Sequence, residues 1–436
     1  MLGIMEKEKI KQFTTEKPFI TLLVVAMVFL GLRLAMVPLV SPEKPPMQCI
    51  EPPYDGCGFI FDEAHYIPAV RRLIYLGQNT NLEHPPLTKS LIALGISIFG
   101  DNPWGWRTFN TIFSAITVLL AGLIALKLGG RPDLALAAQF FLITDVTFLS
   151  LSGTAILDPP ALAFMLLGVY LMLSGRKTLA GVSIGMSLLS KTSGVIALAA
   201  LIGSEAVNTY SKTGDLDKAV QTIRKTLFDV VIPAAIVFVL GVGIYDGLTH
   251  AFESPVQHIG FMFDYHSNLR YNNPAEVELP LTWILPPVTR HPAPYFVVTV
   301  NPPGYHPVAL WGVSTPLWWS IWFVFPLTYL LVKRAASRPG SVENPNPESI
   351  YLGWVGLTIA AYSILAYLLR RWTYSFYFMQ ASVLMAALTP LILMRAGMDR
   401  WIKILLIAQA FWFLLFIPVK PLWLSELLNY LGLDIR

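Results

Sequence analysis

Long apolar runs constrain this chain more than any other feature. Residues 19–40 form the first of these runs, and others recur along most of the 436 residues. A helix that crosses a bilayer needs roughly 20 apolar residues, and a backbone in lipid has to satisfy its own hydrogen bonds. The sequence therefore predicts an all-helical polytopic membrane protein. The first run is too long for the core of a signal peptide, and no clear cleavage site follows it, so we expect it to be a retained span.

About eleven spans follow from the length rule, and we expect them to form a single membrane domain over residues 1–436. They are predicted near residues 18–40, 107–127, 132–150, 155–174, 179–190, 193–208, 227–247, 316–333, 350–369, 373–394 and 401–418. No internal repeat stands out. The formal charge of +4 comes from basic residues that fall mostly between the apolar runs, so nucleic acid is not an expected ligand.

The distribution of Lys and Arg predicts the orientation. Basic residues precede the first span and recur in alternate connections, and cytoplasmic connections carry such an excess. The residues are Lys7, Lys9, Lys11, Lys17, Lys127, Arg131, Arg176, Lys177, Lys212, Lys218, Arg224, Lys225, Lys333, Arg334, Arg338, Arg395, Arg400 and Lys403. We therefore expect a cell-membrane protein with a cytoplasmic amino terminus and two large outward-facing loops, 41–106 and 248–315.

The two cysteines, Cys49 and Cys57, both lie in the first outer loop. In an oxidising space this spacing permits a disulfide. Two unpaired thiols are the alternative.

An acidic pair, Asp62 and Glu63, lies in the same loop directly after an apolar stretch. A carboxylate beside another carboxylate at a low-dielectric boundary should have a raised pKa, which suits a general base near neutral pH. The alternative is a solvated surface pair.

Further polar residues on the outer face could form the binding site of a sugar-transfer reaction. Glu83, His84 and Lys89 surround a rigid Pro-Pro turn, and Asp158 precedes a second Pro-Pro pair. We expect these four side chains to contact the acceptor or the donor sugar. Asp158 could instead serve only as the N-cap of a helix.

Four cations on the predicted outer face run against the charge trend: Arg107, Lys191, Arg370 and Arg371. Ionisable groups at membrane depth are functional candidates, although interfacial cations also extend to lipid headgroups for structural reasons. Cations that hold a lipid phosphate, together with one carboxylate that deprotonates an acceptor hydroxyl, would suffice for sugar transfer by a single displacement with inversion. Glycosidases differ, because two carboxylates flank the bond that they cleave.

No cofactor is required for this chemistry beyond the lipid-linked donor. A divalent metal held by Glu83, His84 and loop histidines is conceivable, but no metal-ligand spacing supports it, and hydrogen-bonding histidines are the better reading. The outer-face histidines are His65, His84, His258, His266, His291 and His306.

Several segments, in order, resemble the protein O-mannosyltransferase family, in the form of a small prokaryotic or archaeal member. In the amino-terminal half they are FDEAHY, EHPPLTK, WRTFNTIFS, LDPP and SLLSKTSG. In the carboxy-terminal half they are ELPLTWILPPVTRHPAPYF, STPLWWSIWF and RRWTYSFYFMQASVLM. The resemblance implies a GT-C membrane fold, shared with the aminoarabinose transferase that modifies lipid A, and dolichyl-phosphate mannose as the donor.

By the same resemblance, Asp62 is the catalytic base and Glu63 shapes the donor or acceptor site. Arg107 matches the family's arginine at the start of the second span, and Lys191 contacts the carrier phosphate. Arg370 and Arg371 begin the segment that matches the penultimate span. The expected acceptor is a Ser or Thr hydroxyl of an exported polypeptide, and the sequence does not indicate an oligomeric state.

The chain departs from the family in three places. The loop 248–315 is too short for the large soluble insertion of the eukaryotic enzymes, which leaves the acceptor open. The element at Thr315 to Trp319 lacks the family's Asn, and Arg290-His291-Pro292 replaces an Arg-Pro, which leaves the donor sugar open. Two alternatives therefore remain: transfer to a lipid or glycan acceptor, and a lipid-sugar flippase or transporter, for which midplane charges and inverted repeats are expected.

Overall fold

The structure of this protein is a computed structural model. It describes residues 16–274, 277–286, 298–300, 304, 308–310, 313–337, 346–417 and 420–433.

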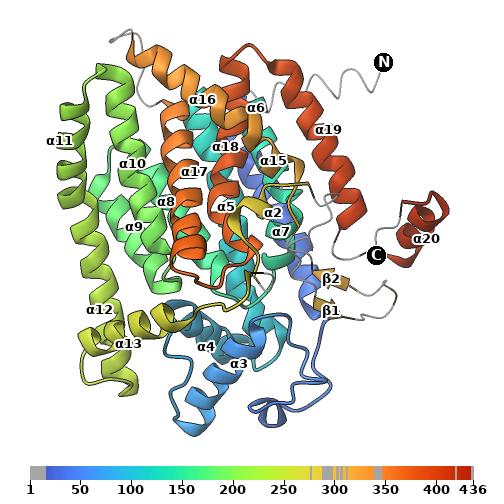
Figure 1. Cartoon of the computed structure of the whole chain (residues 1–436). Coiled ribbons are helices and arrows are strands. Elements are labelled where there is room, and N and C mark those ends of the chain that lie inside the picture. Colours follow the sequence, from blue (N-terminus) through green and yellow to red (C-terminus); the bar gives the residue numbers. More distant parts are fainter. Residues whose placement is uncertain are drawn as a thin grey trace.

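Helices dominate the described residues (Figure 1). The α-helices are α2 (Pro18–Met36), α3 (Glu63–Arg71), α4 (Leu87–Phe99), α5 (Pro103–Gly129), α6 (Pro132–Ile143), α7 (Val146–Leu151), α8 (Asp158–Leu173), α9 (Lys177–Ser190), α10 (Gly194–Thr213), α11 (Leu216–Thr226), α12 (Ile232–Thr249), α13 (Pro255–Asn268), α14 (Pro280–Trp283), α15 (Pro316–Trp319), α16 (Ile321–Ala336), α17 (Pro347–Ser363), α18 (Met379–Arg395), α19 (Asp399–Phe416) and α20 (Leu422–Tyr430). Short 3-10 or π turns are η1 (Val37–Leu39), η2 (Pro46–Cys49), η3 (Arg72–Leu76), η4 (Leu227–Val231), η6 (Ile364–Leu368) and η7 (Ser375–Phe378).

Five helical stretches among the described residues are long and apolar enough to cross a membrane. They are Pro18–Leu39, Pro103–Gly129, Leu216–Thr249, Pro347–Leu368 and Ser375–Arg395. The chain is therefore a multi-pass membrane protein, as predicted. The stretch Leu216–Thr249 has 34 residues and is about 51 Å long, so it extends beyond a hydrocarbon core of about 30 Å.

A helix lies at every position where the sequence predicts a span, but two of these spans are broken. Residues 132–150 divide into α6, which ends at Ile143, and α7, which Asp145 caps by accepting a hydrogen bond from the Phe148 amide. Residues 316–333 divide into α15 and α16. The indole of Trp318 donates to Asp145 over 2.6 Å and joins the two breaks. Helices α8 and α9, with 16 and 14 residues, are shorter than a full crossing, so the number eleven stays a prediction.

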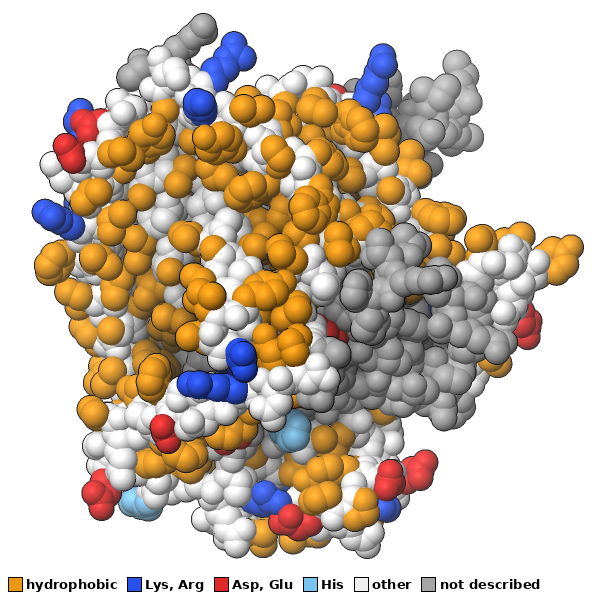
Figure 2. All heavy atoms as spheres, in the orientation of Figure 1, with side chains coloured by type: hydrophobic (Ala, Val, Ile, Leu, Met, Phe, Trp, Pro, Cys, Tyr) orange, Lys and Arg blue, Asp and Glu red, His pale blue; other side chains and the backbone are white. Residues whose placement is uncertain are grey.

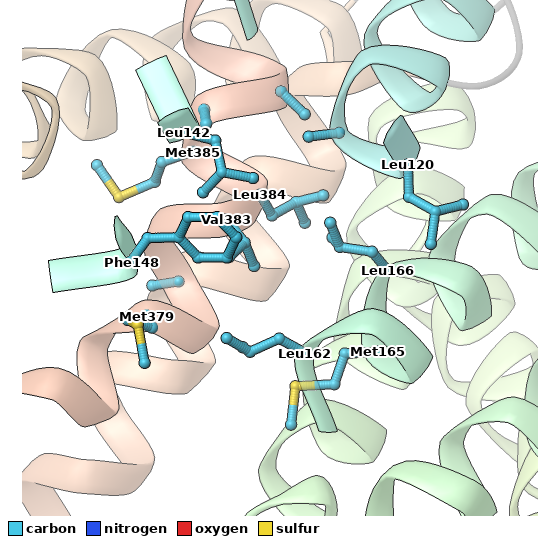
Figure 3. Packing of buried hydrophobic residues seen from close by; sticks show 14 of the residues in the cluster. Leu120, Leu142, Phe148, Leu162, Met165, Leu166, Met379, Val383, Leu384 and Met385 are labelled. Carbon is cyan, nitrogen blue, oxygen red and sulfur yellow. The ribbon is translucent and has the colours of Figure 1, made fainter. Parts of the chain in front are cut away.

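Helix α18 lies at the centre of the bundle (Figure 1), and 94% of its most apolar stretch is buried. Figure 3 shows its side chains meeting those of α5, α6, α7 and α8. The labelled members of this core are Leu120, Leu142, Phe148, Leu162, Met165, Leu166, Met379, Val383, Leu384 and Met385. This packing holds the start of α8 beside the start of α18.

The visible face of the molecule carries a broad band of apolar side chains, and charged side chains gather toward its two ends (Figure 2). Such a band suits a bilayer, because lipid tails accept apolar side chains and exclude charges. At one end, α3, α4 and α13 lie close together across the ends of the long helices (Figure 1).

The two predicted outer loops contain secondary structure. Residues 41–106 hold α3 and α4, and residues 248–315 hold α13, α14 and a short antiparallel hairpin. The hairpin joins β1 (Val298–Val300) to β2 (Val308–Leu310), with Thr299 opposite Ala309. This hairpin is a small departure from the all-helical prediction.

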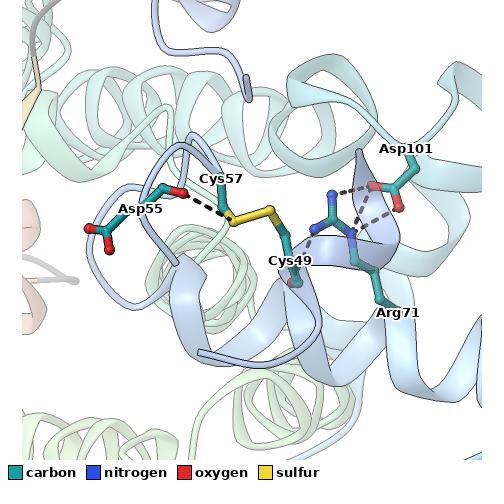
Figure 4. The surroundings of a disulfide bond; sticks show 5 residues. All are labelled: Cys49, Asp55, Cys57, Arg71 and Asp101. Atoms are coloured by element: carbon teal, nitrogen blue, oxygen red, sulfur yellow. Dashed lines mark hydrogen bonds and ion pairs between the residues drawn. A yellow bond between two sulfur atoms is a disulfide. The ribbon is translucent and has the colours of Figure 1, made fainter. Parts of the chain in front are cut away.

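A disulfide between Cys49 and Cys57 closes part of the first loop (Figure 4). Of the two alternatives that the sequence left open, this is the one that the structure contains. Beside it, Arg71 donates to the Cys49 carbonyl and forms a buried ion pair of 2.9 Å with Asp101. The Trp106 indole donates to the same carboxylate over 2.6 Å. The loop is thereby fastened to the beginning of α5.

Candidate active site

A buried ion pair anchors the loop that carries the acidic residues. The guanidinium of Arg107 on α5 donates to both carboxylate oxygens of Glu63, at 2.8 and 2.7 Å. Its remaining N–H groups donate to the carbonyls of Val37, Val40 and Gly58. All five donors of this arginine are therefore used within the protein. The predicted contact of Arg107 with a donor phosphate has no N–H group left to make it.

Glu63 is equally occupied. Its carboxylate also accepts from the backbone amides of Ile60 and Ala155, at 2.8 and 2.7 Å, and the side chain is completely buried. A carboxylate that accepts from four donors has no free lone pair directed at a substrate. Glu63 thus ties α3, α5 and the segment before α8 together.

Asp62 lies directly before α3, and two left-handed residues shape the approach to it. Gly58 has φ +68°, and a Cβ there would lie 2.6 Å from the Pro42 backbone nitrogen. Phe61 has φ 56°, which is uncommon for a residue with a side chain. After this turn the Asp62 side chain is only partly exposed. No described group donates a hydrogen bond to its carboxylate, in contrast to Glu63.

Burial raises the pKa of Asp62 to about 6, while the positive charges of His65 and Lys191 lower it and Asp158 raises it. A carboxylate with a pKa near neutrality binds a proton more readily than an ordinary aspartate does. Half-buried and without a donor, Asp62 can accept a proton from a hydroxyl group.

Asp158 and Lys191 form a second ion pair near Asp62. The Lys191 ammonium lies 2.7 and 2.9 Å from the two oxygens of Asp158. It also lies over the rings of Tyr377 and Phe376, at 4.5 and 5.0 Å from their centres. The side chain of Asp158 caps no amide of α8, which begins at this residue. The interpretation of Asp158 as a helix cap is therefore wrong.

Arg371 and Arg370 have different environments. Arg371 donates to the carbonyl and to the Nδ1 atom of His266, both at 2.9 Å, so it is joined to α13. Arg370 has φ 54° and an exposed side chain. Its carbonyl accepts from the Tyr271 amide over 2.8 Å. The side chain of Arg371 is thus held by α13, whereas that of Arg370 is exposed.

The segment before the Pro-Pro turn is held through its backbone. Lys89 donates to the carbonyl of Asn81, and His258 contacts the carbonyl of Leu82 over 2.9 Å. The Glu83 carboxylate accepts from the Asn81 side chain over 2.9 Å. Lys89 is buried, so its predicted contact with a sugar has no exposed surface to use.

His84 is the member of this segment that reaches the site. Its ring packs against Tyr66 and His266, with centres 5.6 and 5.5 Å away. Burial, together with the charges of Lys89, His266, Lys191 and His65, lowers the pKa of His84 well below its ordinary value. Its imidazole is therefore neutral near pH 7, with one donor and one acceptor nitrogen.

No group of three or more His, Cys, Asp or Glu side chains within the described ranges is arranged to hold a metal ion. Two of the histidines considered from the sequence, His291 and His306, lie outside those ranges.

Sequence reasoning missed the aromatic side chains that surround Asp62. Tyr66 is buried on α3, and the Asp62 charge acts on Tyr66, Tyr374 and Tyr377. The ring of Phe61 meets that of Phe376 at 5.3 Å. One signal could have indicated them: the run Trp372 to Phe378 directly follows the two arginines.

Fold and site together define a class: a multi-pass helical membrane protein with a carboxylate site in the loops at one end. The crystal structure of ArnT from Cupriavidus metallidurans bound to undecaprenyl phosphate has a similar fold. The match covers 86% of this chain and 60% of the ArnT chain, with a TM-score of 0.53 and 14% sequence identity. This likeness confirms the predicted fold class.

The sequence comparisons identify the relatives more specifically than the fold does, but they cover shorter parts of the chain. Residues 98–244, about a third of the chain, match the family described as dolichyl-phosphate-mannose-protein mannosyltransferase. The polyprenol-phosphate-mannose–protein mannosyltransferase of Mycolicibacterium smegmatis is 35% identical over 116 residues, which are 24% of this chain and 22% of that protein. The resemblance to protein O-mannosyltransferases is thus confirmed for this part of the chain.

A second kind of relative also matches. The undecaprenyl phosphate-alpha-4-amino-4-deoxy-L-arabinose arabinosyl transferase of Pseudomonas paraeruginosa is 32% identical over 120 residues, 25% of this chain and 22% of that protein. The alignments span less than a quarter of the length of either relative.

Proposed function

We propose that this protein is a glycosyltransferase that moves mannose, or a related hexose, from a polyprenyl-phosphate carrier to a Ser or Thr hydroxyl of an exported polypeptide. One observation carries the proposal: Asp62 combines a raised pKa with the lack of any described hydrogen-bond donor, next to a neighbour, Glu63, whose carboxylate is fully engaged. The match of residues 98–244 to the mannosyltransferase family supports the substrate class.

The reaction is a single displacement. The acceptor hydroxyl gives its proton to the Asp62 carboxylate, and its oxygen attacks the anomeric carbon. As this bond forms, the bond between the anomeric carbon and the phosphate oxygen breaks, and the carrier phosphate leaves with the electron pair. The sugar is transferred with inversion. The phosphate is a good leaving group, so no general acid is needed.

Binding of the carrier phosphate is assigned to Arg371, with Arg370 beside it at the membrane surface. Arg371 keeps N–H groups beyond those given to His266, and an arginine fork suits a phosphate. Arg107 and Lys191 are better explained by their carboxylate partners. Contact with the sugar or the acceptor is assigned to the neutral His84 and to its chain neighbour Glu83.

The site is assigned to the outer face of the cell membrane, with the amino terminus in the cytoplasm. The disulfide between Cys49 and Cys57 supports this assignment, because such bonds persist in oxidising compartments. The distribution of Lys and Arg supports the same orientation.

Transfer from radiolabelled polyprenyl-phosphate mannose to Ser/Thr-containing peptides tests the proposal. We expect purified wild-type protein to label the peptides and Asp62→Asn to lose at least about 100-fold in rate, the lower range of general-base effects. Asp133→Asn changes an exposed carboxylate and should keep the wild-type rate. Normal transfer by Asp62→Asn would show that Asp62 is not the base.

A lipid or glycan acceptor is the second candidate. The aminoarabinose transferase match and the ArnT fold favour it specifically. The same assay with lipid A and with peptides, each offered undecaprenyl-phosphate aminoarabinose or polyprenyl-phosphate mannose, separates the two candidates by which pair yields product.

A further inference from the structure

We propose that Asp158 and Lys191 are positioning residues: Asp158 holds the Lys191 ammonium away from Asp62, so that Asp62 remains an unpaired base instead of becoming half of a salt bridge. This inference rests on the proposed function for its catalytic consequence. Its structural part, the pairing of the Lys191 ammonium with the Asp158 carboxylate, stands on the contacts of the pair itself.

The charges of Asp158 and Lys191 are bound to each other. Lys191 follows the end of α9 in an extended conformation, and Asp158 begins α8. With two carboxylate oxygens within 2.9 Å, the ammonium uses two of its three protons on Asp158. The faces of Tyr377 and Phe376 cover it further and favour a cation at that point. Side-chain exposures of 9% for Asp158 and 13% for Lys191 leave little room for water to screen the charges.

Asp62 is fixed beside this pair by its two chain neighbours. Phe61 packs on Phe376, the ring over which Lys191 also lies. Glu63 accepts from the Ala155 amide, three residues before Asp158. The acidic loop and the charge pair are therefore attached to the same elements, and their separation is set by the fold.

The charges around Asp62 oppose one another. The titratable groups that act on it or on which it acts come from α3, the start of α8, the end of α9 and the segment before α18: His65, Tyr66, Asp158, Lys191, Tyr374 and Tyr377. Lys191 favours the ionised form of Asp62, and Asp158 disfavours it. Without Asp158, an ammonium beside Asp62 would stabilise the carboxylate and weaken it as a base.

Two single variants are expected to move the ionisation of Asp62 in opposite directions. Asp158→Asn frees Lys191 to pair with Asp62 and should lower the ionisation midpoint by about one pH unit or more. Lys191→Met leaves the Asp158 carboxylate without its cation and should raise the ionisation midpoint of Asp62 by a similar amount. The double variant removes both charges and should return the midpoint close to the wild-type value. Lys191→Arg keeps the charge and should also leave it near wild type.

The midpoint can be read without any enzyme assay, from the infrared band of the protonated carboxyl group that Asp62→Asn removes, followed as a function of pH. The acidic limb of the pH-rate profile for sugar transfer provides the second readout. Asp133→Asn, which changes an exposed carboxylate paired with Arg131, is the matched control and should change neither.

Shifts of the same sign in both single variants, or no shift in either, would overturn the proposal and leave the pair a structural tie. Opposite shifts of the infrared midpoint in a protein that transfers no sugar would support the charge pair and reject the proposed function. A double variant that stays displaced from wild type would also contradict the proposal, because its two charges would then not be acting against each other.

Discussion

Glu63 and Arg107 form a two-pronged ion pair with oxygen to nitrogen distances of 2.8 and 2.7 Å, and their side chains are 0% and 1% exposed. The pair joins α3 to α5 across 44 residues of sequence. It also separates the roles of the adjacent acidic residues: Glu63 holds the loop, and Asp62 is left free for chemistry.

Loss of this pair should destabilise the protein. Glu63→Ala leaves the Arg107 guanidinium buried without its carboxylate, which costs about 3–5 kcal/mol in the free energy of unfolding. Thermal unfolding in detergent measures the effect. Asp133→Ala, which breaks the exposed pair with Arg131, should change it by no more than about 1 kcal/mol. A Glu63→Ala protein with normal stability and no transferase activity would instead give Glu63 a direct role in the reaction.

The pKa of Asp62 predicts how activity depends on pH. A base must be ionised, so the transfer rate should fall about tenfold per pH unit as the pH decreases below about 6. The initial rate of peptide labelling, followed from about pH 4.5 to about pH 8, measures this dependence. A rate that stays constant down to pH 4.5, roughly the range of an ordinary carboxyl group, would contradict the raised pKa.

The same group should affect stability with a definite sign. Because the folded-state pKa of Asp62 lies above its ordinary value of 3.8, ionisation is penalised in the fold, and the penalty is present above about pH 6 and relieved as the pH falls below it. Asp62→Asn should therefore raise the free energy of unfolding at pH 8 by an amount on the order of 1–3 kcal/mol. The gain should vanish near pH 4. An equal gain at both pH values would trace it to packing instead of charge.

Opening the disulfide should loosen the first outer loop. The bond joins residues eight positions apart, and a loop of this size restricts the unfolded chain by about 2–3 kcal/mol. The Cys49→Ser, Cys57→Ser double variant should unfold at a lower temperature, and a reductant should lower the wild type to the same value. Reaction of the unreduced native protein with a thiol reagent would show that the bond is not formed.

Gly58 and Gly77 provide a matched pair for the turn before Asp62. Both have left-handed φ angles, +68° and +63°, so alanine at either position costs about 1 kcal/mol in backbone conformation. At Gly58 the new Cβ would also meet backbone atoms of Ser41 and Pro42 within 2.9 Å, whereas nothing lies within 4 Å at Gly77. Gly58→Ala should lower the melting temperature much more than Gly77→Ala. Equal effects would mean that the close approach to residues 41 and 42 is unimportant.

The apolar runs of the sequence determined that this chain is helical and lies in a membrane, because a backbone in lipid has few other ways to satisfy its hydrogen bonds. The motifs around Asp62, His84 and Asp158 indicated which loops gather at one end. Both conclusions depend on properties that a short stretch of chain carries by itself.

Only the tertiary structure decided which carboxylate each cation is paired with. Sequence alone presented Arg107 and Lys191 as unpaired cations suited to a phosphate, yet each faces a carboxylate 44 or 33 residues away in the chain. Nothing local reveals such a partner, since the Coulomb interaction depends on distance in space and on burial. The fold therefore divides the acidic pair: it surrounds Glu63 with four donors and leaves Asp62, one residue earlier, with none among the described groups.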